Sequence, residues 1–286
     1  MTTGIHIHPG ATVHPDTILA EGVSIGPHVT IEEGVRIGEN TVVEAYVQLR
    51  GPLEIGENCR FFPYSSIGSD PQDVSYKGER TRLVIGDRNI FREFMTVNRG
   101  SPKDEGVTTI GHDNYFMAYT HIAHDCRVGN HIVCMNGATL AGHAGVDDYA
   151  QVSAFTGVHP FCRVGKLAYI GGYSVITQDV LPYCRVAGAR PPLFYGLNTV
   201  GLRRAGLSRE SRQNVKQMFH IIFESDLNTS QAVEKIKTEC PDGAEKDTIS
   251  PLSNVQVGES SKRRQDHGTS RWNNRRLGRN PPVLFP

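Results

Sequence analysis

The sequence predicts a mainly β fold, a parallel β-helix built from six-residue repeats. The first observation is a strict period: an apolar residue occupies every sixth position from Ile7 to Ile67, eleven positions without exception. The second is a gathering of Gly, Asn, Asp and Pro between these positions, as in the twice-used segment Ile-Gly-Glu-Asn. Such residues accept the tight backbone angles of turns. A short strand and a turn every six residues is typical of a hexapeptide-repeat β-helix.

The repeat continues through most of the chain, with two interruptions at 68–82 and 99–108. The original phase returns at Ile85, and a phase shifted by one residue runs from Ile110 to Ile176. Three hexads make one triangular coil, and coils stack at the strand spacing of about 4.8 Å. We therefore expect eight to nine coils. The competing fold, a sandwich of regular strands, does not keep a strict period of six.

Composition excludes several classes of protein. The chain has 286 residues with 30 basic and 30 acidic side chains, so nothing global indicates nucleic acid or an anionic membrane as a partner. No signal peptide is evident at the N-terminus, and no apolar run is long enough for a membrane span. Four cysteines fall on inward repeat positions, where they act as small buried hydrophobes of a reducing compartment: Cys59, Cys126, Cys134 and Cys162. We expect a cytoplasmic protein without a structural zinc site, since Cys-x-x-Cys is absent.

Both interruptions are polar, and long unstructured loops tend to be functional. The first carries Asp73, a candidate ligand contact, although a solvated excursion explains it equally well. The second carries Lys103, Asp104 and Glu105 and indicates less.

The central block holds the candidate catalytic residues. His124 lies at a corner, outside the predicted core, and Gly142 lies at the same corner one coil later, with His143 beside it. A glycine there leaves a backbone N–H unobstructed about 5 Å from the imidazole. A base beside an exposed N–H donor suits acyl transfer, because one accepts a proton and the other stabilises an oxyanion. His121 and His159 are candidate substrate contacts. The alternative is a set of solvated corner histidines.

After Ile176 the repeat stops and prolines mark a joint. Ser208 is expected to cap a helix that ends near Glu224, and Thr229 is expected to cap a second one. Basic residues there would attract an acidic partner protein, or simply form a solvated face. Residues 251–286 are basic and lack an apolar period, which favours disorder; a nucleic-acid-binding tail is the sharper alternative. The predicted organisation is a β-helix at 1–190, a helical domain at 191–250 and a tail at 251–286.

Four segments carry a specific resemblance: 120–126 (THIAHDC), 136–143 (NGATLAGH), 71–73 (PQD) and 198–204 (NTVGLRR). Together they resemble the UDP-N-acetylglucosamine acyltransferase family of lipid A biosynthesis, in order, from about residue 7 to about 250. The resemblance implies a left-handed parallel β-helix, a small α-helical C-terminal domain and a homotrimer with active sites between subunits. It implies transfer of an (R)-3-hydroxyacyl chain from acyl carrier protein to the glucosamine 3-position of UDP-N-acetylglucosamine. No cofactor or metal is implied.

The resemblance also assigns roles to residues. His124 would be the general base, Asp125 would orient it, and the Gly142 N–H would bind the oxyanion. Contacts to substrate or carrier would come from Asp73, His121, His143, His159, Asn198, Arg203 and Arg204. Gly172 would help to set the depth of the acyl groove, and a glycine there predicts a long chain, about twelve to fourteen carbons by resemblance.

Alternatives remain at this stage. Pro160 and Val200 depart from the family pattern and leave open a 3-amino acceptor. A sister N-acyltransferase of the same pathway would carry a large uridine-binding N-terminal domain, whereas this repeat starts by residue 7. A β-helix zinc carbonic anhydrase would use three histidines as ligands and lack the helical domain. A purely structural β-helix would need no clustered histidines.

Overall fold

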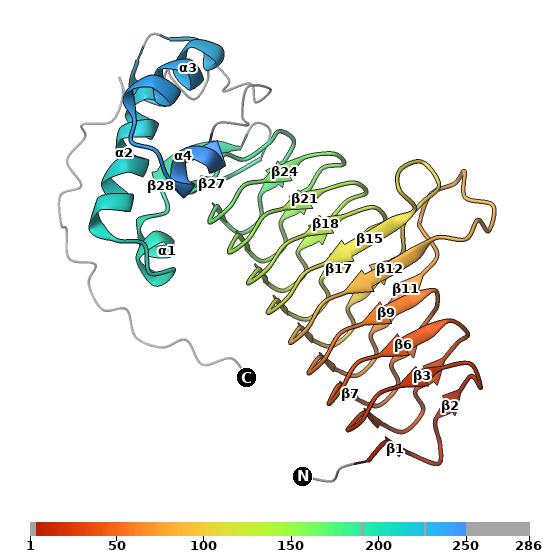
Figure 1. Ribbon diagram of the computed structural model, residues 1–286. Coiled ribbons are helices and arrows are strands. Elements are labelled where there is room, and N and C mark those ends of the chain that lie inside the picture. Colours follow the sequence, from red (N-terminus) through yellow and green to blue (C-terminus); the bar gives the residue numbers. More distant parts are fainter. Residues whose placement is uncertain (1–3, 190–191, 226, 250–286) are drawn as a thin grey trace, which may run out of the picture.

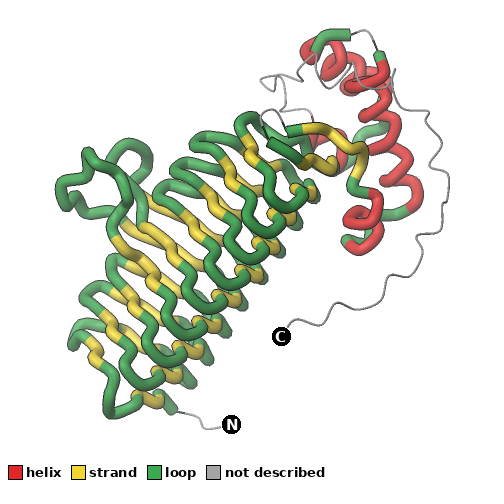
Figure 2. Tube along the Cα trace, turned by 180° about the vertical axis from the view of Figure 1, so that it is seen from behind, coloured by secondary structure: helices red, strands yellow, loops and turns green. Residues whose placement is uncertain are grey.

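A computed structural model describes residues 4–189, 192–225 and 227–249. The chain winds as a left-handed parallel β-helix whose coils stack from β1 near the N-terminus to β27, and a group of helices follows (Figure 1). Three sheets of 11, 9 and 8 strands form the faces of a triangular prism, and all their strands are parallel except the last strand of the first sheet, β28. The tube view shows the short strands stacked from coil to coil (Figure 2).

Each coil contributes one strand to each sheet. Sheet A contains β1 His6–Ile7, β4 Ser24–Ile25, β7 Val42–Val43, β10 Arg60–Phe61, β13 Ile90–Phe91, β16 Tyr115–Phe116, β19 Val133–Cys134, β22 Gln151–Val152, β25 Tyr169–Ile170, β27 Cys184–Ala187 and β28 Leu193–Leu197. Sheet B contains β2 Thr12–Val13, β5 Thr30–Ile31, β8 Gln48–Leu49, β11 Ser66–Ser69, β14 Thr96–Asn98, β17 His121–Ile122, β20 Thr139–Leu140, β23 Gly157–Val158 and β26 Val175–Ile176. Sheet C contains β3 Ile18–Leu19, β6 Val35–Ile37, β9 Leu53–Ile55, β12 Arg82–Ile85, β15 Val107–Ile110, β18 Arg127–Val128, β21 Gly145–Val146 and β24 Arg163–Val164.

The apolar residue of each hexad points into the prism, as the period predicted. Phe61, Phe91 and Phe116 are fully buried and stack on one another through successive coils of sheet A. All six cysteines are buried and free. One strand more than the repeat predicted is present, because β27 pairs with β25 and places Val186 in the core after the period has ended.

Both interruptions are loops at the corner between sheets B and C. The first loop, 70–81, joins β11 to β12, and the second loop, 99–106, joins β14 to β15. Ile85 follows Ile67 by 18 residues instead of six, so the first loop adds a multiple of the period and preserves the phase. Ile110 follows Val97 by 13, so the second loop adds seven residues and shifts the phase by one. The strands on both sides nevertheless stay in register, with Ile85 paired to Ile110.

The helices follow an antiparallel strand, β28, which pairs with β27. They are α1 Thr199–Arg204, α2 Arg209–Glu224, α3 Thr229–Glu239 and α4 Ala244–Ile249. Ser208 caps α2 as predicted, with its side chain accepting from the Ser211 N–H. The predicted cap of the second helix was wrong by one residue: Asn228 caps α3, because it forms a reciprocal capping box with Gln231.

The apolar faces of the helices pack as the sequence predicted. Val215, Met218 and Ile222 of α2 are buried, together with Val233 and Ile236 of α3. Within the described residues, no helix has both the length and the apolar character that a bilayer crossing requires. The predicted tail at 251–286 lies outside the described residues.

Candidate active site

The central feature of the site is a hydrogen-bonded pair, His124 and Asp125, at the corner between sheets B and C. The Nδ1 of His124 lies 2.8 Å from the Oδ2 of Asp125, and the two side chains are 13% and 0% exposed. A carboxylate only accepts hydrogen bonds, so Nδ1 carries the proton and donates it. The Nε2 of His124 then presents a lone pair, which is the form of imidazole that can accept a proton from a substrate.

Gly142 packs directly against this imidazole. A Cβ at Gly142 would lie 2.6 Å from Cε1 and 2.8 Å from Nε2 of His124, closer than any side chain permits. The backbone of the next residue is fixed to the pair, since the His143 N–H donates to the His124 carbonyl at 3.0 Å. Residue 142 must therefore be glycine for the imidazole to keep its place.

The Gly142 N–H is free to bind a substrate oxygen. Among the described residues it has no acceptor. Proline is accepted at this position of other coils, because the coil does not use that N–H: Pro9, Pro15, Pro27, Pro63 and Pro160. At another corner, the equivalent N–H of His112 is taken by the side chain of Asn130 in the next coil. The residue at the same corner one coil after Gly142 is Pro160, whose side chain has no hydrogen-bond acceptor.

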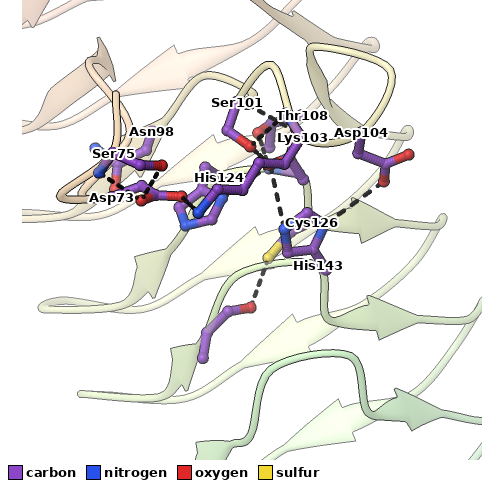
Figure 3. A network of polar contacts seen from close by, with 12 residues as sticks. Asp73, Ser75, Asn98, Ser101, Lys103, Asp104, Thr108, His124, Cys126 and His143 are labelled. Atoms are coloured by element: carbon purple, nitrogen blue, oxygen red, sulfur yellow. Dashed lines mark hydrogen bonds and ion pairs between the residues drawn. The ribbon is translucent and has the colours of Figure 1, made fainter. Parts of the chain in front are cut away.

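His143 completes the polar cluster. Its ring meets that of His124 edge to face, and Phe161 stacks on its other side with centroids 4.5 Å apart. Its Nε2 lies 3.6 Å from Asp125 Oδ2, and its Nδ1 lies 3.6 Å from Asp104 Oδ2. The imidazole therefore lies between two carboxylates, Asp125 of the coil below and Asp104 of the second loop. Figure 3 shows the contact with Asp104.

The two loops are joined to each other beside the pair. Lys103 of the second loop reaches Asp73 of the first loop, Nζ to Oδ2, at 2.7 Å (Figure 3). The hydrogen bond from Lys103, and then those from Ser75, hold the pKa of Asp73 well below its usual range. The predicted substrate contact Asp73 is thus brought to the site, and its carboxylate is paired with a lysine.

His121 lies on the outer face of sheet B, in β17, the strand that directly precedes the pair. Its Nδ1 is 2.7 Å from the Thr96 hydroxyl. Burial, followed by the charge of the nearby His124, lowers the pKa of His121.

The other predicted contacts are not joined to this cluster within one chain. His159 is exposed, and the one described hydrogen bond of its side chain is to the adjacent Pro160 carbonyl. Asn198 is buried as the cap of α1, accepting from Gly201 N–H and donating to the Leu167 carbonyl. Arg203 and Arg204 are exposed at the end of α1. Gly172 follows β25 at the corner between sheets A and B.

Sequence reasoning missed several members of the site. Ser101 donates to both oxygens of Asp125, and the Thr108 hydroxyl accepts from the Asp125 N–H. Asp104 and Phe161 both contact His143. The one available signal was the second loop itself, an interruption of the period immediately before the histidine block.

A groove of about 890 Å³ opens from the cluster along sheet C. His143, Phe161 and Lys103 line one end, and Lys166 and Thr248 of α4 line the other. In the described part of the chain, the one His, Cys, Asp and Glu group with metal-ligand spacing is His124, Asp125 and His143. That set has two histidines and a carboxylate whose oxygens are already hydrogen-bonded, not the three histidines of a carbonic anhydrase site.

Comparison with known proteins gives consistent matches. Residues 179–256 match the family described as Udp N-acetylglucosamine O-acyltransferase, domain 2, and residues 4–38 match the bacterial transferase hexapeptide family of six repeats. The acyl-[acyl-carrier-protein]–UDP-N-acetylglucosamine O-acyltransferase of Stenotrophomonas maltophilia (strain R551-3) is 43% identical over 230 residues, 80% of this chain and 88% of that protein. The enzyme of the same name from Alkalilimnicola ehrlichii is 48% identical over 176 residues, 61% and 67% of the two chains.

Solved structures agree over nearly the whole chain. The UDP-N-acetylglucosamine acyltransferase of Francisella novicida superposes with a TM-score of 0.84 at 39% identity, covering 88% of this chain and 92% of that one. The Arabidopsis UDP-N-acetylglucosamine acyltransferase superposes with a TM-score of 0.72 at 31% identity, covering 93% and 98%.

Proposed function

Because this chain belongs to the UDP-N-acetylglucosamine O-acyltransferase family, we propose that it acylates the glucosamine 3-hydroxyl of UDP-N-acetylglucosamine. The donor is an (R)-3-hydroxyacyl chain carried by acyl carrier protein, and the reaction is the first step of lipid A biosynthesis. The protein is an acyltransferase that works in the cytoplasm, where nucleotide sugar and carrier meet.

One observation carries the assignment of roles: the imidazole of His124 packs against Gly142, whose N–H has no acceptor among the described residues. His124 Nε2 removes the proton from the sugar hydroxyl, and the hydroxyl oxygen attacks the thioester carbonyl carbon. The carbonyl oxygen becomes an oxyanion, which the Gly142 N–H stabilises. The intermediate then collapses, the C–S bond breaks, and the imidazolium returns its proton to the leaving thiolate. Asp125 holds the imidazole in the required tautomer throughout.

Assembly into a homotrimer is part of this proposal. The outward residues of sheet B carry no Lys, Arg, Asp or Glu: Thr12, Thr30, Gln48, Ser66, Thr96, His121, Thr139, Gly157 and Val175. Those of sheet C include Arg36, Glu54, Arg127 and Arg163. Depletion of charge is typical of the centre of an interface, so sheet B is the face that a neighbouring subunit covers.

The acyl chain has a path on the same face. His124 and Gly172 lie at opposite edges of sheet B, and the outward positions between them include the small residues Thr139 and Gly157. A Cβ at Gly157 would meet nothing within 4 Å. We assign this strip to the acyl chain and Gly172 to its far end.

The carrier and the nucleotide meet basic helices. Arg203, Arg204, Arg209 and Lys216 of α1 and α2 are exposed, and no described acidic residue forms an ion pair with them. Complementary charge accelerates encounter with an acidic carrier protein. We assign Arg203 and Arg204 to the phosphates of nucleotide or phosphopantetheine.

Replacing the base tests the mechanism. His124→Ala is expected to lower the transfer rate by about 10²–10⁴-fold, the usual worth of general-base catalysis. The rate is measured with purified protein, UDP-N-acetylglucosamine and a panel of acyl carrier thioesters, and the melting temperature is followed in parallel. A 3-amino analogue of the sugar, assayed beside it, identifies the acceptor atom.

His131→Ala is the matched control, because this exposed histidine occupies a corner of the same coil stack and packs on Tyr149 away from the pair. Its activity should equal that of the parent. A His124→Ala protein that keeps more than about a tenth of the rate would refute general-base catalysis by His124.

A further inference from the structure

Ser101 is the residue outside the proposed chemistry that is most closely tied to it. It lies in the second loop and is 0% exposed. Its N–H donates to Asp125 Oδ1 at 2.8 Å, and its hydroxyl lies 2.6 Å from Asp125 Oδ2. Since a carboxylate has no proton to give, the hydroxyl is the donor in the second bond. Ser101 therefore donates a hydrogen bond to each oxygen of the carboxylate that orients His124.

These two hydrogen bonds fix the rotation of the carboxylate. Oδ2 is the atom that accepts from His124 Nδ1, and the Ser101 hydroxyl approaches the same atom. The Asp125 backbone is fixed separately, by the bond from its N–H to the Thr108 hydroxyl. Without the Ser101 hydroxyl, the carboxylate could turn Oδ2 toward His143 Nε2, which already lies 3.6 Å away. The imidazole of His124 would then lose the partner that sets its tautomer.

The Ser101 hydroxyl also accepts from the Lys103 N–H of its own loop at 3.4 Å, but the loop does not depend on this hydroxyl alone. The second loop has other anchors: the Gly100 N–H donates to the Arg82 carbonyl at 3.1 Å, Asp104 pairs with Arg127 at 3.0 Å, and Lys103 pairs with Asp73. Hydrogen bonds to a buried charge are also shorter and stronger than those between neutral groups. The 2.6 Å contact between the Ser101 hydroxyl and Asp125 Oδ2 has the length of a hydrogen bond to a charged group.

We propose that Ser101 is a positioning residue of the transfer reaction, which holds Asp125 in the one rotation that keeps the His124 Nε2 lone pair directed at the substrate. The proposal rests on the assignment of His124 as the base. It predicts that catalysis depends on the Ser101 hydroxyl although this group touches neither substrate nor donor.

The test is a comparison of Ser101→Ala with Ser101→Thr. Ser101→Ala is expected to lower kcat by about 10- to 100-fold, because small displacements of a catalytic group have effects of this size. KM for UDP-N-acetylglucosamine should stay within about twofold, since no substrate contact is removed. Ser101→Thr, which retains the hydroxyl, should restore kcat to within about threefold of the parent.

Ser65→Ala is the matched control for buried hydroxyl loss. Ser65 is 1% exposed and its hydroxyl donates to the Phe62 carbonyl at 2.9 Å, at another corner. It should lower the melting temperature about as much as Ser101→Ala and leave kcat unchanged. If Ser101→Ala does not fold, Ser101→Cys, with a weaker donor of similar size, replaces it with the same expectation.

Three results would overturn the proposal. They are a parental kcat in the folded Ser101→Ala or Ser101→Cys protein, a raised KM with an unchanged kcat, or a folded Ser101→Thr protein whose kcat stays as low as that of Ser101→Ala. The His124→Ala protein separates this outcome from failure of the proposed function. If His124→Ala is inactive while Ser101→Ala is fully active, the base stands and the positioning role falls.

Discussion

Asp125 and His124 can bond to each other, although adjacent in sequence, because of the backbone between them. Asp125 has a φ of 59°, in the left-handed region. Neighbouring residues of an extended strand point to opposite sides, whereas this turn brings both side chains together. The same conformation recurs in other coils at the third residue after the buried one, as at His143 and Phe161. The corner thus stacks Asp125, His143 and Phe161 in successive coils.

Gly142→Ala is expected to inactivate the enzyme while leaving it folded. The new Cβ would lie 2.6 Å from the His124 ring, so the imidazole must move by a large fraction of an ångström. Displacements of this order cost about 10²-fold in rate, and kcat from steady-state assays measures the loss. Gly10→Ala, where a Cβ would approach His8 no closer than 3.4 Å, should keep full activity. An active Gly142→Ala protein would show that the imidazole does not need this place.

The half-buried histidine His121 predicts an acid-sensitive stability. Its lowered pKa means that the folded chain holds it neutral where the unfolded chain, with an ordinary value of about 6.5, begins to bind a proton. Stability from this residue is therefore complete above pH about 6.5 and is lost as the pH falls below it. Urea unfolding between pH 7.5 and 5.5 should show this loss, and His121→Asn should show a smaller slope. An equal slope in both proteins would contradict the prediction.

Sequence reasoning reached some of these residues and not others. The repeat placed Gly142 beside His124, because three six-residue repeats make one coil and residues 18 apart therefore occupy the same corner of adjacent coils. Ser101 and Asp104 approach the pair across a loop whose path no repeat dictates. Asn198 was predicted as a ligand contact. Its contacts within the chain, the cap of α1 and a hydrogen bond to the Leu167 carbonyl 31 positions away, could not be read from the sequence.

At the scale of elements, the period determined the strands more firmly than the helices. Each strand of the prism is fixed by a buried residue every sixth position, and errors cannot accumulate because the coils below enforce register. The short helix α1 was not predicted, since six residues carry little periodicity. The cap of α3 was misplaced by one residue because Asn228 and Thr229 are both favourable caps, and only the reciprocal bonds between Asn228 and Gln231 distinguish them.

The corner after β25 sets the prediction for acyl length. Gly172→Met should shift donor preference from chains of about twelve to fourteen carbons toward shorter ones, because the added side chain fills the far end of the strip. A Cβ there meets one atom, the Ala154 carbonyl oxygen at 3.3 Å, so a small adjustment accommodates it. Competition between acyl carrier thioesters of different length measures the shift. An unchanged preference would remove Gly172 from the acyl site.

At the scale of the whole molecule, the site at one prism edge predicts a trimer. A stable assembly of three 31.5 kDa chains is expected at micromolar concentration, because an open half-site cannot enclose the substrate. Light scattering measures the mass. Thr139→Arg, which places a charge on the face assigned to the interface, should weaken assembly, whereas Arg127→Ala on sheet C should not. A monomeric parent protein would contradict a site between subunits.

The stacking of coils has a further consequence for how such a molecule acquires chemistry. Each coil is tied only to the coils above and below it, through its strands, so the length of chain between strands is unconstrained. The first and second loops exploit this freedom at one edge, adding 12 and seven residues while Ile55, Ile85 and Ile110 remain aligned. New binding groups can thus be added in loops without a change in the pairing of the strands. In a periodic chain of this kind, the segments that interrupt the six-residue repeat are the places to look for a reaction.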